Sequence, residues 1–375
     1  MAPILFFYCL YYIILNIIYT IIGKTMSKKN DVIKVKFSNW YDGFSLLDLG
    51  PAFNNNKYLS ETGLAIKESE EADFIIYNVF GDFIANVASD NSKAIKILFI
   101  SEPVSSDFIF FDYCIGFEPY DYGGRNCFYP FFLYSCVANN IIPTQVSYAD
   151  AFSILKSKDI FCEMVFRHDG RDLSRKKYFD LLSSYKKVES AGTYLNNQKD
   201  HLVVDYRDGS RTKYDFQKRC KFSLCIQSIK KEWFINEKIM HSLYANEIPI
   251  FFGCEEVKTI FNPKRIIFIE DYPNDIDLLN RIIEIDNNDE LFCDIISQPI
   301  FNNPNFVDET IDNASKFLYD VFVSQKKRLI EKNRESIIKK YIVNNKKSSD
   351  ELTRLTSTRI YKLFIKVKTI FSRKK

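Results

Sequence analysis

The stretch CKFSLCIQSIKKEWFINEKIMHSLYANEIPIFFG, residues 220–253, decides the fold of this chain. Its first part, CKFSLCIQ, and its last part, EIPIFFG, are short apolar runs typical of buried strands. Between them a polar loop leads to Asn236, a residue type that caps helices, and to an apolar pattern that predicts a helix over residues 236–245. A strand, a helix and a strand in this order form the crossover unit of a parallel sheet, so the stretch predicts an α/β fold.

The same alternation runs through most of the chain. Strands are predicted at VIKVKF, ADFIIYNVF, KAIKILFIS, FIFFDYCIGF, IFCEMVF, KKVESAG, CKFSLCIQ, EIPIFFG and RIIFIED. Helices are predicted within residues 58–71, 85–93, 174–185, 236–245, 275–285 and 307–341. The pattern weakens over residues 142–159, which divides the chain into a first domain (26–150), a second domain (151–335) and a tail (336–375). Two doubly wound, Rossmann-like domains of this kind place a ligand cleft at the carboxyl ends of their strands.

Composition indicates a globular protein. The chain has 375 residues, of which 46% are hydrophobic and 26% charged, so each half can bury a core of its own. Its nine cysteines are scattered and lack the spacing of zinc sites, and they predict reduced thiols in an intracellular compartment. The three histidines are far apart in the sequence and form no nucleophilic or metal-binding motif.

The N-terminal segment has two interpretations. Residues 4–22 are uncharged and match the ~20 residues of a membrane-spanning helix. Lys24, Lys28 and Lys29 follow this run, so an anchor here would leave the body of the protein in the cytoplasm. Alternatively, the chain begins at Met26 and the first 25 residues are an over-extended gene start.

The C-terminal segment is basic and amphipathic. Residues 352–375 contain eight Lys or Arg and no Asp or Glu, and their apolar residues recur at helical spacing. Such a helix can lie on an anionic membrane surface, although a helix packed on the body or a disordered tail fits the pattern equally. No nucleic-acid reader motif accompanies the charge, so no nucleic-acid partner is expected.

The pair Glu237-Lys238 opens the helix predicted at residues 236–245. An ammonium and free backbone N–H groups at a helix start bind anions such as a diphosphate, and a carboxylate there accepts hydroxyl groups. On local physics alone, simple capping with a solvated charge pair is the more common outcome.

The block resembles the signature of the α1,3/4-fucosyltransferases of glycosyltransferase family ten, in their bacterial type. That signature is a YKFxLxFEN strand, a Tyr-Val-Thr-Glu-Lys or Tyr-Ile-Thr-Glu-Lys segment, and a turn in which Pro is flanked by Val or Ile and followed by Tyr-x-Gly. Here CKFSLCIQS, FINEK and IPIFFG stand in the same order, FISEP and FDYCIGF precede them, and FNPK follows. The resemblance implies a GT-B fold and inverting transfer of fucose from GDP-fucose to an N-acetylglucosamine-containing glycan, on a protein or in a lipopolysaccharide.

The resemblance also implies roles for single residues. Glu237 and Lys238 would hold GDP-fucose, and the Arg175 guanidinium would contact its diphosphate. The remaining donor-binding positions are Asn236, Phe234 and Gln227, followed by Ser228. These positions depart from the family, which has Thr, Tyr, Glu and Asn there. The departures keep two alternatives open, namely a different nucleotide sugar on the same fold and an inactive glycan- or membrane-binding protein.

Glu102 is the candidate catalytic base. It follows the apolar run ILFIS, so it lies at the carboxyl end of a strand, and the Ser-Glu-Pro setting resembles that of the family's proposed base. A loop carboxylate without a catalytic role is the alternative. Trp40 and Tyr41 offer an aromatic surface to an acceptor sugar, although a core position for Trp40 is equally consistent.

Asp275-Ile276-Asp277 matches a short acidic motif that binds divalent metal in many glycosyltransferases, but helix capping explains it as well. We therefore expect no cofactor and no required metal, with Mn or Mg at most stimulatory. The expected partners are GDP-fucose, a glycan acceptor that can be lipid-linked, and a membrane surface, which places the protein at the cytoplasmic face of a membrane.

Overall fold

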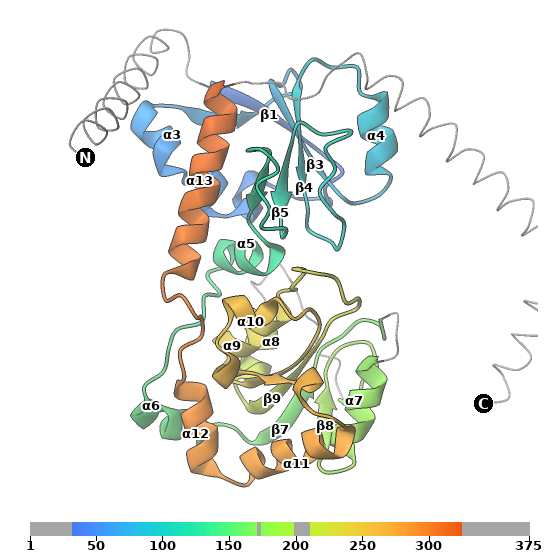
Figure 1. Ribbon diagram of the computed structural model, residues 1–375, viewed down its shortest axis with the longest axis vertical. Helices are drawn as coiled ribbons and strands as arrows, with labels where there is room; N and C mark the ends of the chain where they lie inside the picture. The colour runs from blue at the N-terminus through green and yellow to red at the C-terminus, as the bar shows by residue number, and fades with distance from the viewer. Residues whose placement is uncertain (1–31, 171–173, 199–210, 325–375) are drawn as a thin grey trace, which may run out of the picture.

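The computed structural model describes residues 32–170, 174–198 and 211–324. Two α/β domains lie one above the other in Figure 1. The predicted membrane segment at residues 4–22 and the basic tail at residues 336–375 lie outside the described residues. None of the described helices is both long and apolar enough to cross a membrane.

The first domain is built on a parallel sheet with the strand order β2-β1-β3-β4-β5-β6. Its strands are β1 (Val32–Ser38), β2 (Ala65–Glu68), β3 (Phe74–Asn78), β4 (Ile95–Phe99), β5 (Tyr113–Gly116) and β6 (Asn126–Phe128). Its helices are η1 (Leu46–Leu49), α2 (Pro51–Asn54), α3 (Lys57–Thr62), α4 (Phe83–Ser89) and α5 (Phe131–Ala138). Every residue of β3 and β4 is buried, as expected of strands covered on both faces. The helix predicted within residues 58–71 is shorter than expected. It ends at Thr62, and Ala65–Glu68 form the edge strand β2 instead.

The second domain has a five-stranded parallel sheet with the order β11-β10-β9-β7-β8. The strands are β7 (Ile160–Met164), β8 (Val188–Ser190), β9 (Cys220–Ile226), β10 (Ile248–Phe252) and β11 (Ile267–Phe268). The helices are α6 (Tyr148–Leu155), α7 (Ser174–Ser183), α8 (Arg211–Gln217), α9 (Lys238–Tyr244), α10 (Val257–Ile260), η3 (Pro263–Arg265), η4 (Ile269–Asp271), α11 (Asp275–Asp286) and α12 (Asp289–Ser297). The predicted α/β architecture with two parallel sheets is thus confirmed.

The last described helix, α13 (Phe306–Ser324), returns to the first domain (Figure 1). Its Ser315 carbonyl accepts a hydrogen bond from Asn56 Nδ2 at 2.8 Å, and its Phe322 ring lies 4.7 Å from the ring of Phe74. This arrangement differs from the predicted division, which assigned residues 151–335 to one domain. The amphipathic pattern of α13 predicts a helix but does not say which apolar surface will cover it.

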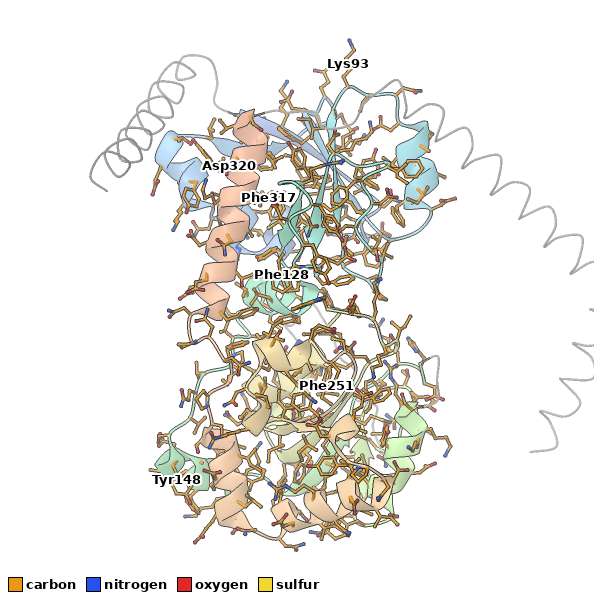
Figure 2. All side chains as sticks on the ribbon, viewed as in Figure 1. Lys93, Phe128, Tyr148, Phe251, Phe317 and Asp320 are labelled. Atoms are coloured by element: carbon orange, nitrogen blue, oxygen red, sulfur yellow. The ribbon has the colours of Figure 1, made fainter. Side chains whose placement is uncertain are left out.

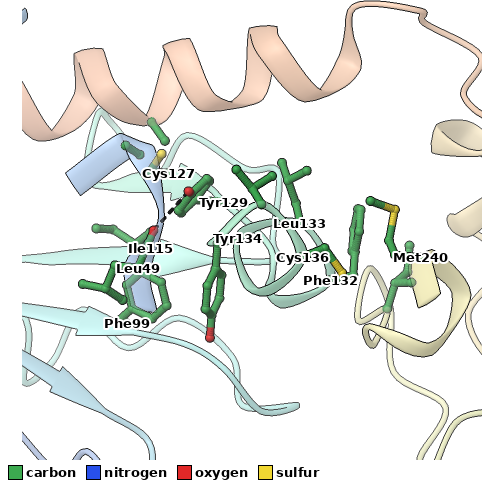
Figure 3. Close-up of a cluster of buried hydrophobic side chains, with 14 of the residues drawn as sticks. Leu49, Phe99, Ile115, Cys127, Tyr129, Phe132, Leu133, Tyr134, Cys136 and Met240 are labelled. Carbon is green, nitrogen blue, oxygen red and sulfur yellow. Dashed lines mark hydrogen bonds between the residues drawn. The ribbon is translucent and has the colours of Figure 1, made fainter. Parts of the chain in front are cut away.

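One hydrophobic cluster joins the two domains. Figure 3 shows Phe132 and Cys136 of α5 directed toward Met240 of α9, while Tyr134 of α5 packs on Phe99 of β4. Phe128, labelled in Figure 2, lies 6.5 Å from the ring of Trp233 in the second domain. Because α5 belongs to the first domain and Glu237-Lys238 stand at the start of α9, this packing sets how the two domains face each other. The eight cysteines within the described ranges are buried free thiols.

Candidate active site

The Glu237-Lys238 pair lies where the loop after β9 enters α9. The helix starts at Lys238, two residues later than predicted, with Glu237 rather than Asn236 at its N-cap position, and the Asn236 side chain accepts the Lys238 backbone N–H at 3.2 Å. The Lys238 ammonium contacts the Glu237 carboxylate at 2.9 Å, and both side chains are about one-fifth exposed, at 21% and 22%. The pair is therefore a partly buried ion pair that solvent and a ligand can still reach.

Two lysines and a histidine lie near Glu237 and keep it ionised. Burial alone would raise the pKa of its carboxyl, but the nearby Lys238, His241 and Lys213 side chains together lower that pKa to about 2. A carboxylate that stays ionised at every physiological pH is a permanent acceptor for hydroxyl groups.

Glu102 faces this pair from the other domain. It follows β4 at the carboxyl end of the first sheet, and its side chain is exposed. Loss of hydration and the nearby Glu237 charge raise the pKa of Glu102, while Lys238 partly offsets the rise. The tertiary structure thus brings the predicted base and the predicted donor pair into electrostatic contact, although they are far apart in the sequence.

Arg175 lies in the first turn of α7 and is almost fully buried. Its Nη1 donates to the His168 carbonyl at 2.6 Å, and its Nη2 lies 3.4 Å from the Ile226 carbonyl at the end of β9. Its guanidinium stacks on the ring of Phe166, with Cζ 4.1 Å from the ring centroid. These contacts fix the guanidinium beside the carboxyl ends of β7 and β9.

Phe166 is a site residue that the sequence did not reveal. The Lys238 ammonium lies 5.8 Å from the centroid of the same ring on which Arg175 stacks. Both cations therefore meet at one aromatic side chain that follows β7, an arrangement stabilised by cation–π attraction. The only sequence signal was the aromatic end of the run IFCEMVF, which reads equally well as core packing.

Gly192 makes room for Phe166. A Cβ atom at Gly192 would lie 2.1 Å from the Phe166 carbonyl oxygen and 2.5 Å from its backbone nitrogen. No side chain fits at that distance, so this position after β8 requires glycine.

Gln227 ends β9 as a buried amide. Its backbone N–H donates to the Phe252 carbonyl at 3.0 Å, and the side chain is 1% exposed. Within the described residues, neither polar atom of its side chain has a hydrogen-bond partner. A buried amide without a hydrogen-bond partner is destabilising, and a bound donor would supply such a partner. The contact of Gln227 with the donor stays a prediction.

Phe234 packs between the domains. Its ring lies 5.3 Å from that of Phe117, at an interplanar angle of 74°, and it belongs to the apolar cluster of the first domain. In the same loop, Lys231 Nζ donates to Ser105 Oγ at 2.7 Å. The loop that carries the predicted donor residues therefore also contacts the first domain. A donor contact of Phe234 stays a prediction.

Trp40 and Tyr41 differ in their surroundings. The Trp40 Nε1–H donates to the Ile76 carbonyl at 3.0 Å, and its ring stacks on Phe44 at 3.9 Å, so Trp40 packs within the first domain. Tyr41 is 53% exposed, which leaves its ring accessible to an acceptor.

Asp275 and Asp277 lie in the first turn of α11. Asn274 caps that helix by accepting the Asp277 N–H at 2.9 Å, and Asp275 pairs with Lys177 at 2.8 Å. Among the described residues, no group of three His, Cys, Asp or Glu side chains is arranged to hold a metal ion.

Known proteins share this architecture. Two solved structures of an α1,3-fucosyltransferase, one of them with GDP-fucose, have TM-scores of 0.62 and 0.60 and identities of 18% and 17%. Each match covers 81% of this chain, and 95% and 93% of the solved chains, respectively. The fold is therefore that of a GT-B fucosyltransferase.

Sequence comparison leads to the same family. A putative fucosyltransferase of Acanthamoeba polyphaga mimivirus is 31% identical over 265 residues, 68% of this chain. An α-(1,3)-fucosyltransferase of Helicobacter pylori is 22% identical over 329 residues, 79% of this chain. The matches span 41% and 64% of those relatives, respectively. Residues 155–296 match the family model for the C-terminal part of glycosyltransferase family 10 (fucosyltransferase). Residues 155–296 therefore form a domain of glycosyltransferase family 10, the fucosyltransferase family.

Proposed function

We propose that the chain is an inverting fucosyltransferase that moves fucose from GDP-fucose to an N-acetylglucosamine-containing glycan. The observation that carries this proposal is the convergence of Glu102, from one domain, with Glu237 and Lys238, from the other. The match to a solved complex with GDP-fucose supports the choice of donor.

The reaction is a single displacement at the anomeric carbon of fucose. The acceptor oxygen forms the new glycosidic bond while its proton moves to the Glu102 carboxylate. On the opposite face, the bond between the anomeric carbon and the β-phosphate oxygen breaks, and its electron pair leaves with GDP. The raised pKa makes Glu102 a stronger base than an ordinary carboxylate, which suits this proton transfer.

Arg175 and Lys238 stabilise the departing GDP in this proposal. A guanidinium offers two parallel N–H donors to phosphate oxygens, and the ammonium adds a point charge beside it. Both cations lie at the ring of Phe166, and Glu237 next to them accepts hydroxyl groups of the donor. We infer that two fixed cations make a metal unnecessary for leaving-group stabilisation.

A second donor sugar is the competing proposal. It is favoured by the buried Gln227 amide, which replaces the family's carboxylate and is followed by Ser228 rather than Asn. An amide donates as well as accepts, so a donor with a different hydroxyl pattern can satisfy it.

The acceptor and the location are also proposals. A basic amphipathic tail at residues 352–375 supports binding to an anionic membrane surface, and a lipid-linked glycan at the cytoplasmic face fits such a placement. An inactive protein that only binds glycans or membranes would share the tail but not the transfer activity.

The first test is transfer itself. The wild type, mixed with GDP-fucose and a lactosamine acceptor, is expected to release GDP and yield a fucosylated product, with a rate that falls as acidic pH protonates Glu102. Glu102→Gln removes the base and is expected to lower kcat by about 100-fold or more. Glu118→Gln is the matched control, because Glu118 accepts a backbone N–H from Ser106 at 3.1 Å and a glutamine can do the same. Full activity of Glu102→Gln would exclude Glu102 as the base.

A further inference from the structure

A second lysine is buried behind the donor pair. Lys213 of α8 is 6% exposed, and its Nζ lies 2.7 Å from Nδ1 of His241 on α9. Burying an ammonium is costly unless its hydrogen bonds and its charge are compensated. An ammonium can only donate and a neutral imidazole nitrogen can accept, so this contact fits a charged Lys213 that donates to a neutral His241. Burial and the Lys213 charge both hold the pKa of His241 well below its usual range, which agrees with a neutral ring.

The groups around Lys213 single out Glu237 as its charge partner. The titratable groups that interact with Lys213 are Glu237, Lys238 and His241 at α9, Glu163 of β7, Cys225 of β9, Cys136 of α5 and Glu247, which precedes β10. Three of these are carboxyls, and burial raises the pKa of Glu247 well above its usual range. Glu163 already accepts from Gln217 Nε2 at 2.8 Å and from Ser223 Oγ at 2.5 Å, and burial raises its pKa. Glu237 is the carboxyl whose ionised form prevails, and Lys213 contributes to that state.

The same lysine also supports the first turn of α9. The His241 backbone N–H donates to the Glu237 carbonyl at 3.0 Å, so the imidazole held by Lys213 lies one turn below the donor pair. Without Lys213, the Lys238 ammonium would be the main cation left to balance the Glu237 carboxylate. An ammonium committed to that carboxylate is less available to a diphosphate.

We propose that Lys213 is a positioning residue of the donor site, which helps to balance the Glu237 charge and holds the start of α9 in place so that Lys238 can bind a diphosphate. This inference rests on the proposed function. It assigns no contact between Lys213 and the donor, because Lys213 acts from the buried side of α9.

GDP binding by calorimetry at pH 7.5 and pH 5.5 tests the inference. Lys213→Gln keeps a donor for His241 but removes the charge, and is expected to weaken GDP binding about tenfold at pH 7.5. Loss of the cation raises the pKa of Glu237, and protonation of that carboxylate frees Lys238, so the ratio of variant to wild-type Kd is expected to be smaller at pH 5.5. Lys213→Arg keeps the charge and is expected to bind GDP like the wild type.

Lys158 provides the matched control. It is also a buried lysine of the second domain, but its ammonium donates to the carbonyls of Lys218, Cys220 and Ala245 at 3.1, 2.8 and 3.1 Å and faces Glu247 rather than Glu237. Lys158→Gln is expected to lower the melting temperature without changing the Kd for GDP.

The outcomes separate the two proposals. Wild-type affinity in Lys213→Gln, or an equal loss in Lys158→Gln, overturns the role of Lys213 and leaves the proposed function standing. A wild type that does not bind GDP overturns the proposed function and this inference with it. If Lys213→Gln does not fold, Lys213→Arg decides, since a tenfold loss of affinity there contradicts a role that depends on charge.

Discussion

At the scale of single residues, the site is an arrangement of charges around one aromatic ring. Phe166 receives the Arg175 guanidinium at 4.1 Å and the Lys238 ammonium at 5.8 Å. Two like charges repel each other unless something compensates them, and here the ring and the Glu237 carboxylate do so. The arrangement is suited to a diphosphate. The negative charge of a diphosphate would balance the positive charge that the ring and the carboxylate do not compensate.

This arrangement predicts that transfer does not need a metal. If Arg175 and Lys238 lie next to the leaving group, as proposed, addition of a chelator is expected to change the initial rate by less than about twofold, since fixed cations would supply the stabilisation that a metal supplies elsewhere. The measurement is GDP release with and without chelator, with a metal-dependent glycosyltransferase assayed in parallel as a control. Complete loss of activity that Mn or Mg restores would contradict this assignment.

At the scale of elements, the ends of parallel strands place the site. Phe166 follows β7, Gln227 follows β9 and Glu102 follows β4, so every one of them lies just beyond the carboxyl end of a strand. The close approach of the ends of β7 and β8 depends on Gly192, which follows β8 and abuts the Phe166 backbone.

Gly192→Ala is expected to disturb both stability and donor binding. The new methyl group would overlap backbone atoms of Phe166, which cannot move without its strand, so the free energy of unfolding is expected to fall by about 1–3 kcal/mol. Displacement of Phe166 is also expected to raise the Kd for GDP.

Gly63→Ala controls for stability alone. Gly63 ends α3 with a φ of 76° and has no atom within 4 Å of an added Cβ. Chemical denaturation and GDP calorimetry are the two measurements. Equal GDP affinity in both variants would contradict the role given to Phe166.

At the scale of the whole molecule, catalysis depends on how the domains face each other. The proposed base lies in the first domain and the proposed donor pair in the second, and the loop after β9 joins the domains through Phe234 on Phe117 and Lys231 on Ser105. The cluster between α5 and α9 seen in Figure 3 adds a second connection.

Phe234→Ala is expected to separate donor binding from turnover. Loss of the buried ring lowers the free energy of unfolding by about 3 kcal/mol and loosens the contact between the domains. If Phe234 acts through the domain contact rather than through a contact with the donor, GDP affinity is expected to change less than kcat, because the donor pair stays within the second domain.

Phe161→Ala is the matched control for that variant. Phe161 is 9% exposed and packs on Phe222 at 5.5 Å inside the second domain, so its loss costs stability without touching the first domain. Both variants are assayed at a temperature at which calorimetry shows them folded. An equal drop of kcat in the two would mean that stability, rather than domain contact, limits turnover.

Much of this molecule could be predicted from the sequence because strands and their ends are local features. Each of the nine apolar runs contains a strand, although in RIIFIED only Ile267–Phe268 forms one, and the Asn236 side chain accepts the backbone N–H of Lys238 at the start of α9, since hydrophobic length and capping chemistry act over a few residues. The short strands β2 and β6 were missed because partner strands, rather than their own composition, define them.

The tertiary structure decided which of these pieces meet. The sequence by itself determined the two α/β units and the residue types that can bind phosphate, accept hydroxyl groups and take up a proton. Only folding placed Glu102 opposite Glu237, brought Arg175 and Lys238 to one ring, put Lys213 behind α9 and returned α13 to the first domain. These are contacts between residues distant in the chain, and their free energy comes from the packing and desolvation of surfaces that no local pattern encodes.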